Sequence, residues 1–218
     1  MGWEQLHTLA QGGIMMFVNL GVSIVAVAIV LLKAYALWIR HRMSVPAFSD
    51  AVVAQVDQGN YAAALQLASK ERHPVATMAK DVLLKADRSD KEIERALEST
   101  ASRELPRFKR MTGLLPQAGN LATLIGLVGT IQGLIEAFGG AQVEDASQRQ
   151  AVLAKGITVA FYNTYFGLSI AVFCAITFLI LNGRQSLILE QMETALNRIR
   201  DHLMDRNRSL RSKPARAV

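Results

Sequence analysis

Hydrophobic and polar residues are strongly segregated along this chain. Three stretches, residues 5–32, 112–135 and 156–183, contain no Asp, Glu, Lys or Arg. Each is longer than the roughly 20 apolar residues that a helix needs to cross a bilayer. The pattern therefore predicts an all-α membrane protein with three transmembrane helices.

The charged segments between and after these stretches show the periodicity of amphipathic helices. Within residues 44–111, Pro46 can open a helix, Asn60 is a candidate N-cap, and Ser89 with Glu92 forms a capping box. We predict short helices there, the last running on into the second span. After the third span, apolar residues recur on one side of a helix suited to contacts between subunits: Ile188, Met192, Leu196, Ile199 and Leu203.

The placement of Lys and Arg predicts the orientation of the chain. Of the 24 basic residues, residues 1–32 contain none, residues 33–111 contain 14, residues 136–155 contain two and residues 184–218 contain eight. Basic residues gather on the cytoplasmic side of a membrane, so we expect a periplasmic N-terminus and a cytoplasmic C-terminus. The formal charge of +6 then indicates contact with membrane lipid headgroups and argues against nucleic-acid binding.

These patterns divide the chain into six segments. The predicted segments are an N-terminal periplasmic lead with the first transmembrane helix (1–43), a helical cytoplasmic domain (44–111), the second transmembrane helix (112–138), a short periplasmic loop (139–153), the third transmembrane helix (154–183), and a cytoplasmic amphipathic helix with a basic tail (184–218).

Side chains that could support enzyme chemistry are scattered. The only cysteine, Cys174, lies in the third span and is expected to be a buried small residue. The four histidines, His7, His41, His73 and His202, have no metal-binding spacing, and no Gly-rich stretch is followed by Lys-Ser/Thr as in a phosphate loop. The sequence therefore predicts no enzyme, no metal site and no cofactor.

Small residues form one continuous face on each of the last two spans. The two faces consist of Ala118, Ala122, Gly126, Gly129, Gly133 and Ala137, and of Gly156, Ala160, Gly167, Ala171 and Cys174. In lipid, close contact between small residues drives helix association. Polar residues at mid-span, Thr130 with Gln132 and Asn163 with Thr164, need partners or water. From the residues alone, a packing face and the wall of a lumen fit equally well.

Taken together, the two spans resemble the MotA/TolQ/ExbB proton-channel superfamily, and most closely its three-span TolQ/ExbB branch. In the second span, "GLVGTIQGLIEAF" is similar to the family pattern G-L-x-G-T-V-x-G-x-x-x-x-F. In the third span, "GITVAFYNTYFGLSIAV" is similar to G-I-x-x-A-L-x-x-T-x-x-G-L-x-x-A. The segments "GNYAAAL" and "RELPRFKRMTGLLPQAGNLATLIGL" also resemble that branch, and the likeness in spacing covers nearly the whole chain.

The resemblance implies a homopentameric ring in the bacterial inner membrane, with the second and third spans lining a lumen. Two copies of a single-span partner of the ExbD/TolR/MotB type would lie inside that lumen and carry an ionisable Asp. Proton flow past that Asp would drive movement of the partner for envelope work, namely transport, envelope integrity or motility. By position, Thr130 and Thr164 match the two family threonines that face the proton path. Asn163 and Gln132 depart from the motif and could replace the lost polarity beside that path. Glu136, at the outer edge of its span, is either a candidate for the outer mouth or an interfacial acid that ends the span. Close helix packing is implied at Gly126, Gly129, Gly133, Gly156 and Gly167.

One position departs from the family pattern. The glutamate that ExbB and TolQ carry three residues after the glycine matching Gly156 is replaced here by Val159. Since neither span holds an acid or base at mid-membrane, the proton carrier must come from a partner. The alternative is a non-conducting scaffold ring that holds a partner's transmembrane helix. The missing acid favours a specialised motor paralogue, such as one for gliding motility or polymer export, over an iron-uptake ExbB.

Overall fold

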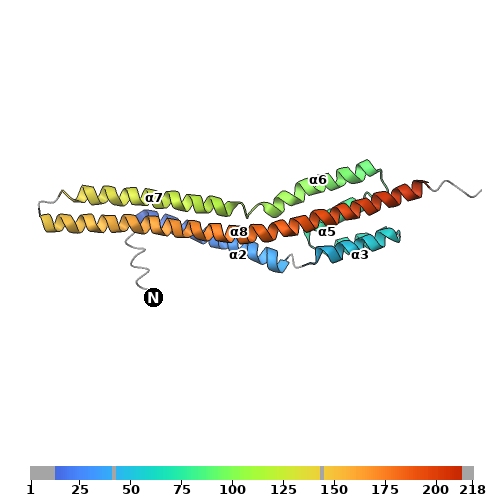
Figure 1. Cartoon of the computed structure of the whole chain (residues 1–218), viewed down its shortest axis with the longest axis horizontal. Helices are drawn as coiled ribbons and strands as arrows, with labels where there is room; N and C mark the ends of the chain where they lie inside the picture. Colours follow the sequence, from blue (N-terminus) through green and yellow to red (C-terminus); the bar gives the residue numbers. More distant parts are fainter. Residues whose placement is uncertain (1–12, 41–42, 143–144, 213–218) are drawn as a thin grey trace, which may run out of the picture. The chain divides into compact units, whose positions relative to one another are not determined.

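The computed structural model describes residues 13–40, 43–142 and 145–212, and these residues form helices and no strand (Figure 1). Three of the helical segments are long and apolar enough to cross a membrane, which confirms the predicted class. The chain forms two compact units. We call residues Met1–Lys33 and Met111–Leu181 the membrane bundle, and Ala34–Arg110 with Asn182–Val218 the helical domain. The predicted N-terminal lead (1–12) and the end of the tail (213–218) lie outside the described residues.

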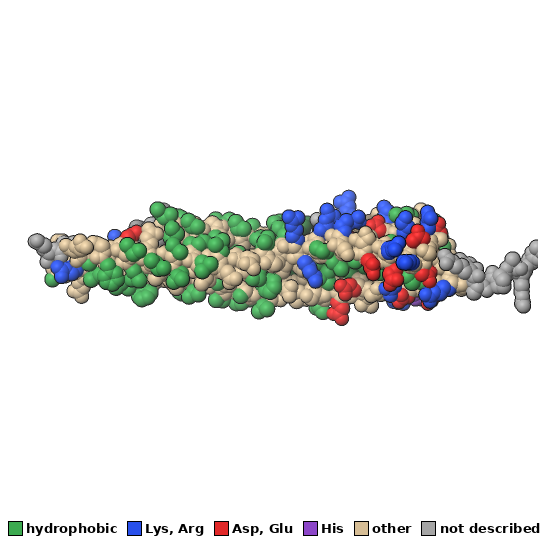
Figure 2. Space-filling view, turned by 90° about the horizontal axis from the view of Figure 1, so that it is seen from above, with side chains coloured by type: hydrophobic (Ala, Val, Ile, Leu, Met, Phe, Trp, Pro, Cys, Tyr) green, Lys and Arg blue, Asp and Glu red, His purple; other side chains and the backbone are tan. Residues whose placement is uncertain are grey.

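Within the described residues, the membrane bundle contains three helices. They are α2 (Gly13–Tyr35), α7 (Leu114–Gly140) and the first part of α8 (Ala146–Ser212). Their shared core is made by Ala26, Ala122, Ile170 and Cys174, with Val22, Ala118 and Phe166 packed against it. Cys174 is completely buried, which confirms the expectation for this residue. Figure 2 shows many hydrophobic side chains on the visible face of this part of the chain.

A turn separates the second span from the helix that precedes it. Helix α6 (Asp90–Lys109) ends before residues 110–113, and α7 begins at Leu114, so the continuous helix that we predicted is interrupted. Pro116 explains the break, because a proline has no N–H to offer the carbonyl of Thr112 and its ring clashes with that carbonyl. The Thr112 carbonyl instead accepts a hydrogen bond from the N–H of Leu115, only three residues further on, at 3.3 Å.

Helix α8 is 67 residues long and contains both the third span and the amphipathic segment. It begins at Ala146, well before the predicted start of the third span at residue 154. The Asp145 carboxylate caps this end, since its Oδ1 accepts from the backbone N–H of Ser147 at 2.9 Å and from its hydroxyl at 2.8 Å. Gly183 does not end the helix, because one glycine costs a helix interior only about 1 kcal/mol.

In the described residues of the helical domain, four α-helices accompany the second part of α8. They are α3 (Val45–Asp57), α4 (Tyr61–Lys70), α5 (Pro74–Leu83) and α6, and a π-helical turn (Ala36–Arg40) precedes them. Asn60 accepts from the N–H of Ala63 at 3.1 Å, and Ser89 and Glu92 form both bonds of the capping box. Both predicted caps are confirmed.

The apolar side of α8 forms part of the core of the helical domain. Ile188, Met192, Leu196, Ile199 and Leu203 are all buried, as the periodicity predicted. They are covered by the chain's own helices, so this side is not free for contacts between subunits. Polar contacts hold the same stretch: His202 Nδ1 lies 3.0 Å from Asp57, and the Asn207 amide donates to the Ala86 carbonyl at 2.7 Å. Charged side chains gather on the surface of this domain in Figure 2.

Candidate functional site

Helices α7 and α8 meet along the small residues of the two spans. Apart from Leu115 at its start, the buried positions on α7 are all glycine or alanine: Gly119, Ala122, Gly126, Gly129, Gly133 and Ala137. A Cβ built at Gly126 would lie 2.8 Å from the backbone oxygen of Asn163, and one built at Gly156 would lie 2.8 Å from the Cα of Ala137. The two backbones are therefore closer than side chains at these positions would allow. We call this contact the α7–α8 seam.

Two threonine hydroxyls face each other across the seam. The Oγ1 atoms of Thr130 and Thr164 are in hydrogen-bond contact. The Thr130 hydroxyl can also donate to either of two carbonyls, that of Gly126 at 3.0 Å or that of Ala160 at 3.1 Å. Both threonines are half-buried. Since each hydroxyl has one proton and several acceptors nearby, the pair can exchange hydrogen-bond partners without moving the backbone.

Asn163 lies inside the seam, one residue before Thr164. Its side chain is 2% exposed, and its amide donates to the Val159 carbonyl at 3.1 Å. It fills the space beside Gly129, where an added Cβ would lie 2.6 Å from the Asn163 Cγ. The structure thus brings Asn163 together with Thr130 and Thr164, but encloses it between the helices.

Gln132 lies on a different side of α7 from Thr130. Two residues correspond to about 200° around a helix, so the two side chains diverge. The Gln132 amide donates to Oε1 of Glu136, one turn further on, at 3.0 Å. Glu136 is exposed and Gln132 is half-buried. The residues expected on one polar path therefore form two groups, the Thr130–Thr164–Asn163 cluster and the Gln132–Glu136 pair.

Among the described residues, α7 and α8 carry no Asp, Glu, Lys, Arg or His at the level of this cluster. Val159, at the position of the family glutamate, is half-buried. The described residues also contain no group of His, Cys, Asp and Glu that could hold a metal ion. The cluster can therefore donate, accept and exchange hydrogen bonds, but it cannot take up a charge.

Asn19 and Asn120 are polar residues of the bundle that sequence reasoning did not assign to a site. Asn19 is 1% exposed, and its amide donates to the Ala122 carbonyl at 3.0 Å, which joins α2 to α7. Asn120 lines a mostly apolar hollow of about 500 Å³ between α7 and α8, together with Gly119 and Ala175. An amide inside a charge-free stretch was the available signal for both residues, since such a group needs a polar partner.

Comparisons with known proteins agree with this architecture. Residues 66–194 match the sequence model described as the MotA/TolQ/ExbB proton channel family. The chain is similar to a biopolymer transport protein ExbB homolog of Methanothermobacter thermautotrophicus, with 26% identity over 179 residues, covering 82% of this chain and 63% of that protein. It is also similar to the biopolymer transport protein ExbB-like 3 of Synechocystis, with 29% identity over 181 residues, covering 83% of this chain and 84% of the relative.

A solved structure shares the fold. A chain in the structure of C. jejuni MotAB superposes with a TM-score of 0.60 at 15% sequence identity, covering 97% of this chain and 85% of that chain. At this identity the likeness concerns the fold alone. Our chain spans slightly less than two thirds of the length of the archaeal relative.

Proposed function

The chain belongs to the MotA/TolQ/ExbB proton channel family, and from this premise we propose that it is the ring subunit of a motor driven by the proton-motive force. Membership makes it a stator- or energiser-type ion-channel subunit, a multi-pass protein of the inner membrane, and not an enzyme. The proposal adds the ring, the partner and the way in which proton flow is coupled to movement.

In the proposed assembly, five copies surround two copies of a single-span protein of the ExbD/TolR/MotB type. The partner contributes a membrane-embedded Asp, because α7 and α8 hold no acid or base at mid-span. The N-terminus is periplasmic and the helical domain cytoplasmic, which the distribution of Lys and Arg supports. Movement of the partner then performs work on the envelope outside.

The observation that carries the proposal is the Thr130–Thr164 hydroxyl pair at an uncharged seam. A protonated Asp passing the pair meets groups that can both donate and accept, and none that would hold it as an ion pair. Moving one charge through 100 mV yields about 2.3 kcal/mol, which suffices to move a partner along a wall without fixed charges. Asn163 supports the pair from within the seam, and the exposed carboxylate of Glu136 would attract cations at the outer mouth.

A hydroxyl-specific set of variants tests this role. In Thr130→Ala/Thr164→Ala, proton flux through the complex with its partner should fall by about two- to tenfold, because a hydrogen bond between uncharged groups contributes roughly 0.5–1.5 kcal/mol. Thr130→Ser/Thr164→Ser keeps both hydroxyls and should retain most of the flux. Thr177→Ala is the matched control, since that hydroxyl donates to the Phe173 carbonyl of its own helix at 2.7 Å. Unchanged flux in an assembled Ala/Ala complex would contradict the proposed role.

One observation favours a second function. Val159 stands where an acid is expected, which fits a ring that holds a partner helix without conducting ions. The partner distinguishes the two functions. Copurification followed by mass measurement identifies it, and a membrane-embedded Asp in its span supports the channel, whereas a span with no ionisable residue supports the scaffold.

A further inference from the structure

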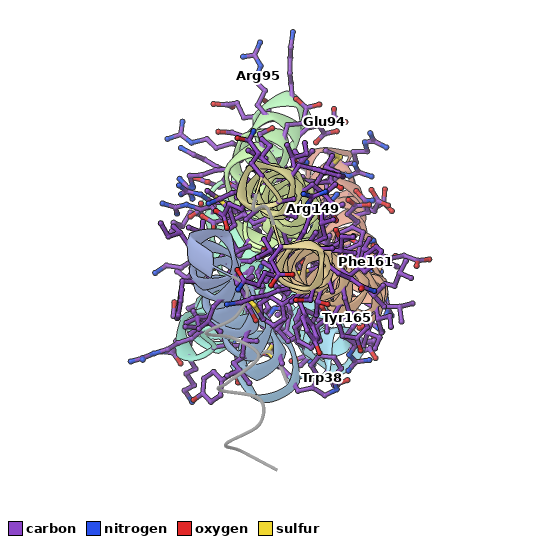
Figure 3. All side chains as sticks on the ribbon, turned by 90° about the vertical axis from the view of Figure 1, so that its left-hand side faces the viewer. Trp38, Glu94, Arg95, Arg149, Phe161 and Tyr165 are labelled. Atoms are coloured by element: carbon purple, nitrogen blue, oxygen red, sulfur yellow. The ribbon has the colours of Figure 1, made fainter. Side chains whose placement is uncertain are left out.

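Tyr162 and Tyr165 present aromatic side chains on an outer face of α8. Their exposed fractions are 36% and 72%. Both lie within the charge-free stretch that begins at Gly156, at depths of about 9 and 14 Å from its start at 1.5 Å per residue. Figure 3 shows Tyr165 and its neighbour Phe161 pointing away from α2 and α7. With Thr158, these residues line a hollow of about 360 Å³ on the surface of the bundle.

The tyrosine hydroxyls differ from the other hydroxyls on the same face. Thr158 donates to the Ala154 carbonyl at 2.7 Å, and Ser169 donates to the Tyr165 carbonyl at 2.8 Å, so both are satisfied within α8. Within the described part of the chain, neither tyrosine hydroxyl has such a partner. A hydroxyl without a hydrogen bond is costly in the hydrocarbon region, so this face needs acceptors from another molecule.

Acceptors at the matching depth lie on α7. The Gln132 amide donates to Oε1 of Glu136, which leaves Oε1 of Gln132 and Oε2 of Glu136 available to a donor. Gln132 is about 100° around the helix from Gly133, which faces the seam, so its side chain points to the side of the seam and not into it. A Cβ at Gly133 would lie 3.2 Å from the Cα of Ala160, which places Gln132 near the level of Tyr162.

We propose that α8 of one copy packs against α7 of the next copy, with the Tyr162 hydroxyl donating to Oε1 of Gln132 in that second copy. The two faces lie on different helices and differ in chemistry, so the contact is heterologous and can close into a ring. Copies related by rotation about an axis normal to the membrane hold each residue at the same depth. Two residues at the same depth in one copy are therefore also at the same depth when they come from neighbouring copies. The inference rests on the ring proposed above and adds the residues that join its subunits.

Crosslinking in native membranes tests the pairing. The full-length chain carries Cys174→Ala, a small substitution at a completely buried site, together with Tyr162→Cys and Gln132→Cys. A short bis-maleimide crosslinker should then give a ladder of covalent oligomers, while each single-cysteine variant stays monomeric on a denaturing gel. The matched control pairs Tyr162→Cys with Leu134→Cys, which lies about 200° around α7 from Gln132 at nearly the same level.

Mass measurement of the same variants without crosslinker separates the possible failures. A ladder from the Leu134 pair alone, or no ladder from either pair in an oligomer of normal mass, overturns the pairing and leaves the ring in place. The second of these results would indicate that the tyrosines face lipid or the partner helix. A monomeric mass for the unmodified chain overturns the ring and the pairing together.

A double-mutant cycle tests the hydrogen bond itself. Tyr162→Phe removes the hydroxyl and should weaken each contact between subunits in a detergent titration by about threefold, the average for an interhelical hydrogen bond in a membrane protein. In a Gln132→Leu background the same change should have no further effect. An equal loss in both backgrounds would show that the hydroxyl does not bind this acceptor.

Discussion

The membrane bundle and the helical domain are both built from helices, but different contacts hold them together. The core of the helical domain contains large side chains that are almost completely buried, such as Met78, Ile93 and Ile199. The seam of the membrane bundle is made by glycine and alanine, and a buried amide, Asn19, joins its third helix. Burial of a large apolar side chain is favourable when the alternative is water, whereas in lipid the alternative is equally apolar. Buried positions recur with the same helical period in both units, but they hold large apolar residues in the core of the helical domain and small residues at the seam of the membrane bundle.

The largest effect is expected from a cavity in the helical domain. Ile199→Ala should destabilise this domain by about 2–5 kcal/mol, because the residue is fully buried. Hydrogen exchange followed by peptide should show faster exchange in α3–α6 and in the second part of α8, with α2 and α7 unchanged. Leu124→Ala is the control, since Leu124 is 60% exposed on the bundle surface. Equally faster exchange in both units would mean that they unfold together, which would contradict the conclusion that different contacts hold them.

A smaller loss of stability is expected at the seam, where a substitution adds atoms instead of removing them. Gly126→Ala adds a methyl group 2.8 Å from a backbone oxygen and should cost about 1–3 kcal/mol through overpacking. Gly129→Ala meets the Asn163 side chain instead, so Asn163→Ala should restore stability to that variant and not to Gly126→Ala. Thermal stability in detergent measures both, and Gly139→Ala, with no atom within 4 Å of the added methyl, is the neutral control. Rescue of both variants, or of neither, would contradict the described seam.

The sequence predicted the elements better than it predicted their contacts. The three spans, the Asn60 cap and the Ser89–Glu92 capping box follow from local rules and are present. Helix α8 extends back to Ala146, before the predicted third span, because Asp145 caps it, and that capping signal is visible in the sequence. The enclosure of Asn163 was beyond reach, because it depends on a glycine of another helix. A small-residue stripe has the same period whether it faces a helix or a lumen, so the sequence could not separate those roles.

The smallest stability effect is expected at the N-terminus of α6. Ser89→Ala should cost about 1 kcal/mol in the helical domain, since the hydroxyl caps the helix. Hydrogen bonds from the Ser89 hydroxyl, and then from its backbone N–H, hold the pKa of Glu92 below its usual value. A lowered pKa in the folded state stabilises the fold above the pKa of the unfolded state, and this contribution is lost as the pH falls through the folded value.

The difference between Ser89→Ala and the unmodified chain should therefore shrink when the pH falls below about 4. Chemical unfolding of the full chain at several pH values measures it. Ser102→Ala, at an exposed position within the same helix, is the control and should show little change at any pH. A Ser89→Ala deficit that stays constant at every pH would show that Glu92 takes no part in the cap.

The central claim is that this chain forms the wall of the proton path and that a partner supplies the titrating group. The most direct test is proton flux into vesicles containing the purified chain alone or the chain with its copurifying single-span partner, under the same membrane potential. The account predicts no flux above that of empty vesicles for the chain alone, and flux with the partner that is lost when the partner's membrane Asp is replaced by Asn. Flux through the chain alone, at the level of the complex, would contradict the account.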